Sequence, residues 1–414
     1  MRIVYLNPCG NFGGAETSLR ELLAGVRAAE PSWRLWMVLG EDGPLAEAAR
    51  ALQVQVIVKP FPAALRRIGD TSEGPLRTLV SLARALPGTA RYALSLAALL
   101  RDLQPDVLHT NGLKMHLLGA WARPRRTPLV WHIHDYVSAR RFTSRLLRAF
   151  RRACTVAIAN SKSVARDLEA LLLRIPIRPI YNAVDLLRFS PSGSQLDLDS
   201  LAALPPAGPG IIRIGLVATF AKWKGQEVFL EAMARLRNRA AVRGYIIGGP
   251  IYQTAGSQWM KSELQRKVED LGLRDMVGFT GFVDDVPAAM RSLDIVVHAS
   301  TQPEPFGMVI VEAMASSKPV VASQSGGATE LFIDGVNALG HRPGDTAMLA
   351  ERIQLLVDDA GLRARLGQAG RESAERNFPA RRLAQELGDL YREISSEAGS
   401  AHRTAAMMAG AEKA

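Results

Sequence analysis

Residues 295–315 read IVVHASTQPEPFGMVIVEAMA, and they join two apolar runs through a polar loop. The run Ile295–Ala299 has the length and composition of a buried β-strand, and Met308–Ala315 is predicted to be helical. Pro305 fits the first turn of that helix because it lacks a backbone N–H. The first N–H groups of a helix have no partner within it, so they can bind an anion such as phosphate. Here these groups belong to Phe306, Gly307, Met308 and Val309.

Two glutamates flank this predicted anion site. Glu304 precedes the helix and Glu312 lies within it, and the eight residues of separation span at most ~12 Å if helical. Carboxylates repel phosphate but accept hydrogen bonds from hydroxyl groups. The pair therefore fits a sugar on one side of a diphosphate and a ribose on the other. For the spacing alone, the alternative is an exposed acid before a helix and a second acid within it.

Strand and helix alternate along most of the chain. Further β-type runs are Ile3–Leu6, Leu35–Leu39, Val54–Val58, Val107–His109, Leu129–His132, Thr155–Ala159, Ile211–Ala218, Gly244–Gly248, Val277–Thr280 and Pro319–Ala322. Helix-length segments lie between several of them, which is typical of parallel sheets covered on both faces. We therefore predict an α/β protein with two tandem doubly wound, Rossmann-like domains, and a ligand-binding cleft between them.

Composition suggests where these domains begin and end. The first domain is predicted over residues 1–190 and the second over residues 211–380, joined by a Ser-, Pro- and Gly-rich linker over residues 191–210. A helix is expected over residues 381–396. The Ala- and Gly-rich residues 397–414 are expected to form a disordered tail.

Two other loops follow predicted strands and carry residues suited to a phosphorylated ligand. Gly13 and Gly14 lie between a strand and a helix, where the backbone can approach a ligand closely. Their spacing does not match the dinucleotide-binding fingerprint, which disfavours an NAD-dependent oxidoreductase. In the second domain, Lys222 and Lys224 follow a strand and can neutralise a diphosphate. Plain tight turns and solvated lysines are the alternatives.

Two histidines in one predicted strand, His132 and His134, point to the same face. They could mark a metal site, but no further ligand set stands out in the sequence, and we predict none. We interpret His134 as a contact for a substrate hydroxyl or phosphate; the alternative is a histidine that caps a buried strand end. Cys9 and Cys154 are too few for a disulfide framework.

The net charge of +11 belongs entirely to the first half of the chain. Residues 1–205 hold 27 Lys and Arg against 16 Asp and Glu, and arginines are densest from Arg123 to Arg152, a stretch that includes the predicted helix 138–153. The segment Arg140–Arg152 could lie on an anionic membrane or simply be a solvated helix. Aromatic residues make up only 6% of the chain, which argues against nucleic acid as a partner.

No apolar run reaches the ~18–20 residues of a membrane span. We expect a cytoplasmic protein, with a peripheral position on the inner face of the membrane as an alternative.

Taken together, these motifs resemble those of retaining glycosyltransferases with the GT-B fold, in the group 1 family (glycosyltransferase family 4). The resemblance covers about residues 1–396, and the Glu304–Glu312 block with Pro-Phe-Gly inside it is its most specific part. The other segments that carry it are Gly13–Glu16, His134–Asp135, Asn182–Asp185, Lys224–Gly225 and Ser325–Gly327.

This resemblance implies a role for each candidate residue. Glu304 would hold hydroxyls of the donor sugar and Lys224 would balance the diphosphate, while His134 would contact sugar or phosphate near the reacting centre. Glu312 would bind the ribose. The remaining donor-binding residues would be Gly13, Gly14, Thr219, Lys222, Val283 and the amides of Phe306, Gly307, Met308 and Val309. The helix over 381–396 would pack back on the first domain, which would hold the acceptor.

One position departs from the family pattern. Members usually carry an arginine five residues before the lysine, and here that position is Thr219. Lys222 or an arginine of the first domain would have to supply the missing charge.

The resemblance implies transfer of a sugar from a nucleotide-diphosphate donor to a hydroxyl of a glycan, lipid-linked glycan or small molecule. The expected reaction retains the anomeric configuration, belongs to polysaccharide biosynthesis, and needs neither metal nor cofactor. Two alternatives remain open: a GT-B nucleotide-sugar epimerase, and a catalytically weak protein that binds sugar nucleotides or polyanions.

Overall fold

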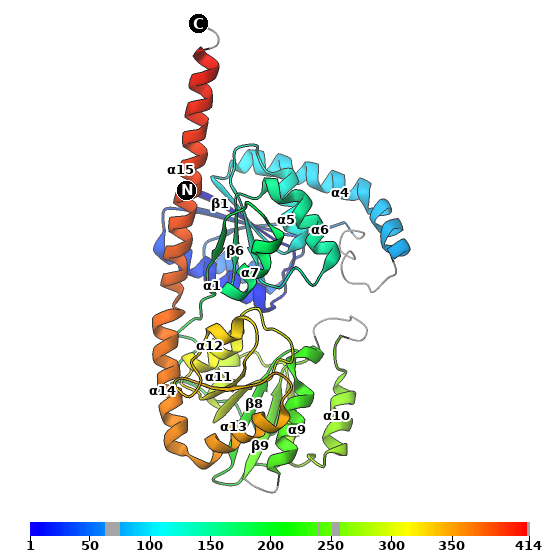
Figure 1. The fold of residues 1–414 in the computed structure, drawn as a ribbon, viewed down its shortest axis with the longest axis vertical. Helices are drawn as coiled ribbons and strands as arrows, with labels where there is room; N and C mark the ends of the chain where they lie inside the picture. The colour runs from blue at the N-terminus through cyan, green and yellow to red at the C-terminus, as the bar shows by residue number, and fades with distance from the viewer. Residues whose placement is uncertain (63–74, 238–240, 251–256, 412–414) are drawn as a thin grey trace. The chain divides into compact units, whose positions relative to one another are not determined.

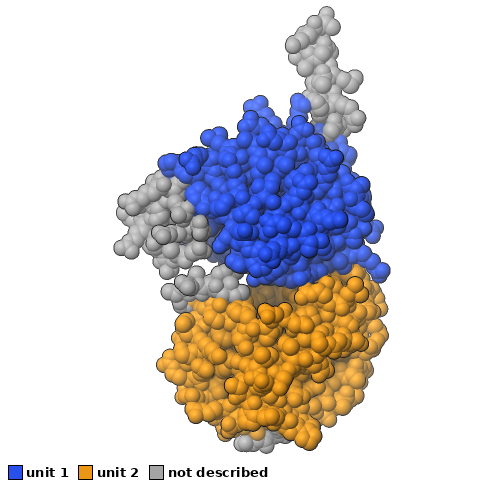
Figure 2. Space-filling view, turned by 180° about the vertical axis from the view of Figure 1, so that it is seen from behind, with its two compact units in different colours: residues 1–183, 380–414 blue, residues 184–379 orange. Residues whose placement is uncertain are grey.

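Two parallel β-sheets organise the chain in the computed structural model, which describes residues 1–62, 75–237, 241–250 and 257–411 (Figure 1). The chain divides into two compact units (Figure 2). Unit 1 comprises Met1–Ala183 and Ala380–Ala414, and unit 2 comprises Val184–Pro379. Both sheets are covered by helices, so the predicted pair of doubly wound α/β folds is confirmed.

Unit 1 holds a seven-stranded sheet with the order β3-β2-β1-β4-β5-β6-β7. Its strands are β1 (Arg2–Asn7), β2 (Arg34–Leu39), β3 (Gln55–Val58), β4 (Val107–Asn111), β5 (Leu129–Ile133), β6 (Val156–Ala159) and β7 (Ile177–Pro179). Its helices are α1 (Gly14–Ala29), α2 (Pro44–Ala51), α4 (Pro75–Leu103), α5 (Leu113–Ala122), α6 (Arg141–Phe150), α7 (Lys162–Leu171) and α15 (Ala380–Ala411).

Alternate residues of each central strand enter the two cores of unit 1. On β1, Val4 and Leu6 pack with α4 and α5, whereas Ile3 and Tyr5 pack with α1 and α15. Because both faces are covered, the central strands are continuous apolar runs, which is why they can be recognised in the sequence. The helix α15 is part of this core through Leu383, Leu387 and Tyr391.

Unit 2 holds a six-stranded sheet with the order β10-β9-β8-β11-β12-β13. Its strands are β8 (Ile212–Val217), β9 (Val242–Ile247), β10 (Val277–Gly281), β11 (Ile295–His298), β12 (Val320–Ser323) and β13 (Leu339–His341). Its helices are α8 (Leu198–Leu201), α9 (Gln226–Leu236), α10 (Lys261–Asp270), α11 (Val286–Arg291), α12 (Met308–Ala315), α13 (Thr346–Asp358) and α14 (Ala360–Asn377), with short 3-10 turns at η2 (Lys222–Lys224) and η3 (Gly327–Glu330).

The strand order of each sheet reverses direction once. In unit 1 the chain moves outward from β1 to β3 and then resumes on the other side of β1 with β4; in unit 2 the same reversal separates β8 from β11. Loops that leave the carboxyl ends of two such strands diverge, and the crevice between them is where open α/β sheets bind ligands. The fold therefore directs attention to the loops after β1 and β4, and after β8 and β11.

The predicted linker over residues 191–210 is not a linker in the structure. It belongs to unit 2, which begins at Val184 rather than after residue 210. Asp199 on α8 is buried, and its carboxylate accepts hydrogen bonds from Arg243 and Tyr245 at 2.6 Å each. The Pro-, Gly- and Ser-rich composition concealed this buried, charge-paired anchor.

The C-terminal end also differs from expectation. The predicted disordered tail began at residue 397, but α15 continues to Ala411. Alanine has the highest helix propensity of all residues, so an Ala-rich extension can prolong an established helix. Within the described part of the chain, no helix is both long and apolar enough to cross a membrane.

Candidate active site

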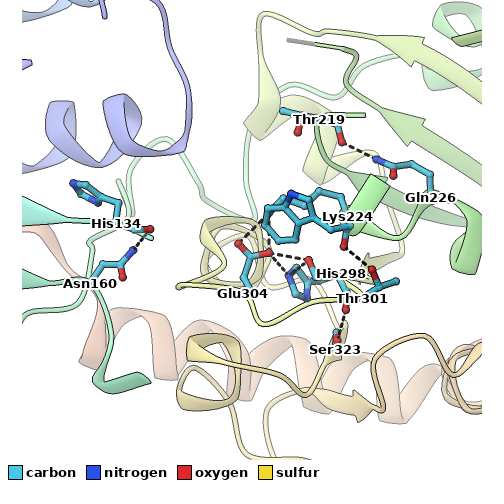
Figure 3. A network of polar contacts seen from close by, with 11 residues as sticks. His134, Asn160, Thr219, Lys224, Gln226, His298, Thr301, Glu304 and Ser323 are labelled. Atoms are coloured by element: carbon cyan, nitrogen blue, oxygen red, sulfur yellow. Dashed lines mark hydrogen bonds and ion pairs between the residues drawn. The ribbon is translucent and has the colours of Figure 1, made fainter. Parts of the chain in front are cut away.

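The central residues of the site meet where the loops after β8 and β11 diverge. These strands are neighbours, with Ile295 paired to Ile214 and Val297 to Leu216, so their carboxyl ends lie together. Lys224 follows β8 at the end of η2, and Glu304 follows β11. The Nζ atom of Lys224 lies 2.7 Å from Oε2 and 3.0 Å from Oε1 of Glu304 (Figure 3). The structure thus joins two residues that are 80 positions apart in sequence.

Glu304 is held from both its backbone and its side chain. Its backbone N–H donates to the carbonyl of Ser325 at 3.3 Å, and its carbonyl accepts from the N–H of Gly327 at 2.7 Å. These two bonds attach it, strand-like, to the loop after β12. Only 6% of the residue is exposed. The segment Ser325–Gly327, which carries part of the family resemblance, therefore fixes the position of the glutamate.

Two further side chains, which sequence reasoning missed, complete the carboxylate's surroundings. The Nε2 atom of His298 lies 3.1 Å from Oε2 of Glu304, and the hydroxyl of Ser300 donates to the same oxygen at 2.8 Å. Both residues are buried at the end of β11. A histidine at the end of an otherwise apolar strand, two residues before a serine, was the signal that could have identified them.

The Glu304 carboxyl is ionised in this environment. Burial alone raises its pKa, but the charge of Lys224 and the hydrogen bond from His298 outweigh burial and hold the pKa well below its usual range. The result is a fixed negative charge beside a lysine. Such a group can accept hydrogen bonds from sugar hydroxyls while the ammonium faces a phosphate.

Gly225 allows the lysine loop to lie against β11. Its φ is +78°, and a Cβ atom there would lie 1.9 Å from the carbonyl oxygen of Ala299. Any larger residue would push η2 away from the end of β11, so a glycine directly after Lys224 is required. Next along the chain, the buried Gln226 donates to the carbonyl of Thr219 at 2.6 Å. Thr219 is half-buried, and Lys222 is exposed with its Nζ 4.6 Å from the centre of the Trp259 ring.

The predicted anion-binding helix is α12, which begins at Met308 after Gly307 with φ +104°. Phe306 is buried and packs edge-on against Phe378, with ring centres 6.0 Å apart. Because Met308 and Val309 form the first turn, their N–H groups have no acceptor within the helix. Glu312 lies half-buried on α12. Val283, half-buried, follows the outer strand β10.

Unit 1 contains a pocket of about 160 Å³ at its own reversal of strand order. It is lined by residues at and just beyond the carboxyl ends of β1, β4 and β5, including Asn7, Asn111, His132 and His134. The Nε2 atom of His134 lies 3.1 Å from Oδ1 of Asn111. The backbone carbonyl of His134 accepts a hydrogen bond from the side chain of Asn160 at 3.3 Å (Figure 3). Burial lowers the pKa of His134 to about 4, so its imidazole is neutral at pH 7.

The Gly13–Gly14 motif of unit 1 is adjacent in sequence to two residues that line this pocket. Gly13 precedes α1 and Gly14 begins it, and the next two residues, Ala15 and Glu16, line the pocket. Among the described residues, no group of three or more His, Cys, Asp or Glu side chains is arranged to hold a metal ion.

Two family profiles match the chain, one in each half. Residues 12–188 match the profile described as "Glycosyltransferase Family 4", and residues 210–373 match "Glycosyl transferases group 1". The lipopolysaccharide core biosynthesis mannosyltransferase LpcC of Rhizobium leguminosarum bv. viciae is 27% identical over 78% of this chain and 93% of its own length. The D-inositol 3-phosphate glycosyltransferase of Salinispora tropica is 33% identical over 60% of this chain and 52% of its own length.

Solved structures agree with these matches. The Anabaena protein Alr3699/HepE in complex with UDP superposes with a TM-score of 0.75 at 26% identity, covering 95% of this chain and all of that one. Its complex with UDP-glucose gives a TM-score of 0.74 at 27% identity. With both halves matched and the two-unit fold shared, the chain belongs to the group 1 glycosyltransferases and is an enzyme of the GT-B fold.

Proposed function

We propose that this enzyme transfers a sugar from a nucleotide-diphosphate donor to a hydroxyl of a glycan or lipid-linked glycan, with retention of anomeric configuration. The observation that carries the proposal is the ionised Glu304 beside Lys224, close in sequence to the start of α12. The similar Anabaena protein binds UDP and UDP-glucose, which supports a nucleotide-sugar donor. The similarity to a lipopolysaccharide core mannosyltransferase supports a glycan acceptor and a role in polysaccharide biosynthesis.

The candidate site residues of unit 2 have separate roles in the proposed donor complex. Glu304 accepts hydrogen bonds from the donor sugar, and Glu312 accepts them from the ribose. The ammonium of Lys224 contacts both Glu304 and the diphosphate. The amides of Phe306, Gly307, Met308 and Val309 bind sugar and phosphate oxygens. Val283 contacts the base, and in unit 1 Gly13, Gly14 and His134 contact phosphate or sugar.

The proposed mechanism stabilises the leaving diphosphate. Breaking the bond between the sugar and the diphosphate puts negative charge on the phosphate oxygens, and the start of α12 and Lys224 present positive charge to them. The acceptor hydroxyl attacks from the face that the diphosphate leaves and gives its proton to the departing phosphate oxygen. We propose that Lys224 and α12, rather than a divalent ion, balance the charge.

Lys222 is proposed to replace the arginine that the family usually carries at the position of Thr219. It lies two residues before Lys224 and is exposed, and the ring of Trp259 lies 4.6 Å from its Nζ. At an exposed site a cation over an aromatic face is attracted to it by about 0.5–1 kcal/mol. Among the residues that the structure describes, no carboxylate forms an ion pair with Lys222, so a phosphate can recruit this lysine by displacing a weak contact.

The helix α6 is proposed to bind an anionic membrane, where a lipid-linked acceptor would be found. Its arginines Arg141, Arg145 and Arg148 are exposed, and so are the rings of Phe142 (50%) and Phe150 (38%). The buried Leu147 attaches the helix to the core of unit 1. Exposed rings beside arginines combine apolar insertion with attraction to anionic headgroups.

A donor panel tests the proposed function. The purified enzyme is incubated with UDP-, GDP- and ADP-sugars, with and without lipid-linked or free glycan acceptors, and nucleoside diphosphate and products are quantified. We expect release of diphosphate that depends on the acceptor, and a product that keeps the donor's anomeric configuration. Conversion of the donor without any acceptor would instead indicate an epimerase. Tight nucleotide binding with only slow hydrolysis would indicate a sugar-nucleotide-binding protein.

A further inference from the structure

A line of buried polar side chains connects the C-terminal helix α15 to the pocket of unit 1. The hydroxyl of Tyr391 on α15 lies 2.7 Å from Nδ1 of His109 on β4. The Nε2 atom of His109 lies 3.2 Å from Nδ1 of His132 on β5. All three residues are at least 98% buried, so solvent cannot replace these contacts.

The last member of this line contacts the residue proposed for the reacting centre. The rings of His132 and His134 are in tilted contact, with centres 4.0 Å apart and planes inclined by 35°. This follows from their places in the sequence, since residues two apart on an extended chain point to the same side. His132 lines the pocket together with His134.

The hydrogen bonds determine which nitrogen of each ring carries its proton. Burial lowers the pKa of His109 to about 3 and holds that of His132 well below its usual value, so both rings are neutral and each has one N–H. A phenol hydroxyl is a better donor than a neutral imidazole, and an imidazole nitrogen is a better acceptor than a phenol oxygen. The hydroxyl of Tyr5 is close enough to Tyr391 to affect its pKa, but it has no hydrogen-bond partner within the described residues, whereas His109 lies 2.7 Å away. Tyr391 therefore donates to Nδ1 of His109, His109 donates from Nε2, and Nδ1 of His132 accepts.

It follows that the proton of His132 is on Nε2. That nitrogen is buried and has no hydrogen-bond partner within the described part of the chain. A buried N–H without a partner costs free energy unless a ligand satisfies it. The atom therefore points to a ligand oxygen as its natural acceptor.

We propose that Tyr391 acts as a positioning residue: through His109 it fixes His132 as an Nε2–H donor, which binds a hydroxyl or phosphate oxygen of the substrate in the unit 1 pocket beside His134. The inference rests on the proposed function for the identity of the substrate, but the assignment of the proton does not. It gives α15 a task beyond packing, because the helix supplies the group that orders the histidines.

The test is nitrogen NMR of the histidine side chains, combined with kinetics. The chain has seven histidines, so the ¹⁵N-histidine-labelled protein gives few signals, which His132→Gln and His109→Gln variants assign. The variant is Tyr391→Phe. The matched control is Tyr92→Phe, since Tyr92 is also a buried tyrosine of unit 1, and its hydroxyl donates to the carbonyl of Lys59 at 3.0 Å.

We expect His132 in the unaltered protein to carry its proton on Nε2, and Tyr391→Phe to shift His109 and His132 towards a mixture of tautomers. We also expect kcat/KM to fall about tenfold, the effect of one lost hydrogen bond, while Tyr92→Phe changes neither quantity. A proton on Nδ1 of His132 in the unaltered protein would overturn the assignment, whether or not the variant folds. Equal kinetics of the two variants would overturn the positioning role. If no donor supports transfer, the proposed function fails, whereas the tautomer measurement still decides the assignment.

Discussion

Replacing Lys224 by Met leaves Glu304 as a buried carboxylate without its counter-charge. Removing one partner of a buried ion pair costs about 3–5 kcal/mol. The side chains are 23% and 8% exposed, respectively, so the lower end of this range, about 3 kcal/mol, applies. For a domain of this size each kcal/mol lowers Tm by about 2–4 °C, which gives a decrease of about 6–12 °C.

The double variant Lys224→Met with Glu304→Gln separates the effect on stability from the effect on catalysis. With both changes the site is neutral, and His298 and Ser300 can still donate to the amide oxygen of the glutamine. We expect the double variant to recover at least half of the lost Tm. Transfer should remain about 10²–10³-fold below the unaltered enzyme in both variants, since the lysine that meets the developing charge is missing from each.

Thermal unfolding and turnover with a saturating donor measure the two effects independently. Near-normal turnover of Lys224→Met would remove the lysine from the mechanism. A double variant no more stable than Lys224→Met would show that the two side chains are not coupled in the way that their 2.7 Å separation implies.

Four more predictions concern charge. The pKa of Glu304 is lower in the folded protein than its value of ~4.3 in an unfolded chain, so its ionised form stabilises the fold above about pH 4.3, and this stabilisation declines as the pH falls. Glu304→Gln should therefore flatten the acid limb of a curve of Tm against pH. An unchanged acid limb would contradict the ion pair. Lys222→Ala should raise the donor KM several-fold, whereas Lys267→Ala, which removes the other lysine beside Trp259, should not; equal effects would argue against a phosphate contact. EDTA should leave transfer intact, and a loss that Mg²⁺ reverses would refute metal independence. Arg145→Gln with Arg148→Gln should weaken pelleting with anionic liposomes by about 30-fold, at ~1 kcal/mol per arginine neutralised, while Arg266→Gln with Arg274→Gln in unit 2 should not; salt-independent pelleting would contradict the membrane proposal.

The sequence was sufficient for the fold wherever burial gives a strong local signal. Strands buried on both faces, such as β1 and β11, are continuous apolar runs, and glycine-rich loops after them indicate the ligand-binding edge. The strands β7 and β13 were missed because they are three residues long and lie at the edges of their sheets, where no apolar run marks them.

Side-chain partners were much harder to predict from the sequence than the helices and strands that carry them. Glu304 and Lys224 were recognised separately, but nothing local indicates that residues 80 positions apart form an ion pair. His298 and Ser300 escaped attention because a polar residue at a strand end has many uses. The line from Tyr391 to His132 depends on packing between α15 and a sheet whose residues lie more than 200 positions before Tyr391. Hydrophobic periodicity identifies single helices and strands, so it cannot predict such a contact.

A crystal structure of the enzyme with an intact nucleotide-sugar donor would test the central claim most directly. We expect the carboxylate of Glu304 to accept hydrogen bonds from sugar hydroxyls, with the diphosphate at the start of α12 and the ammonium of Lys224 turned towards it. A donor bound elsewhere, or one that leaves Glu304 and Glu312 facing away from it, would refute the proposed roles of both glutamates.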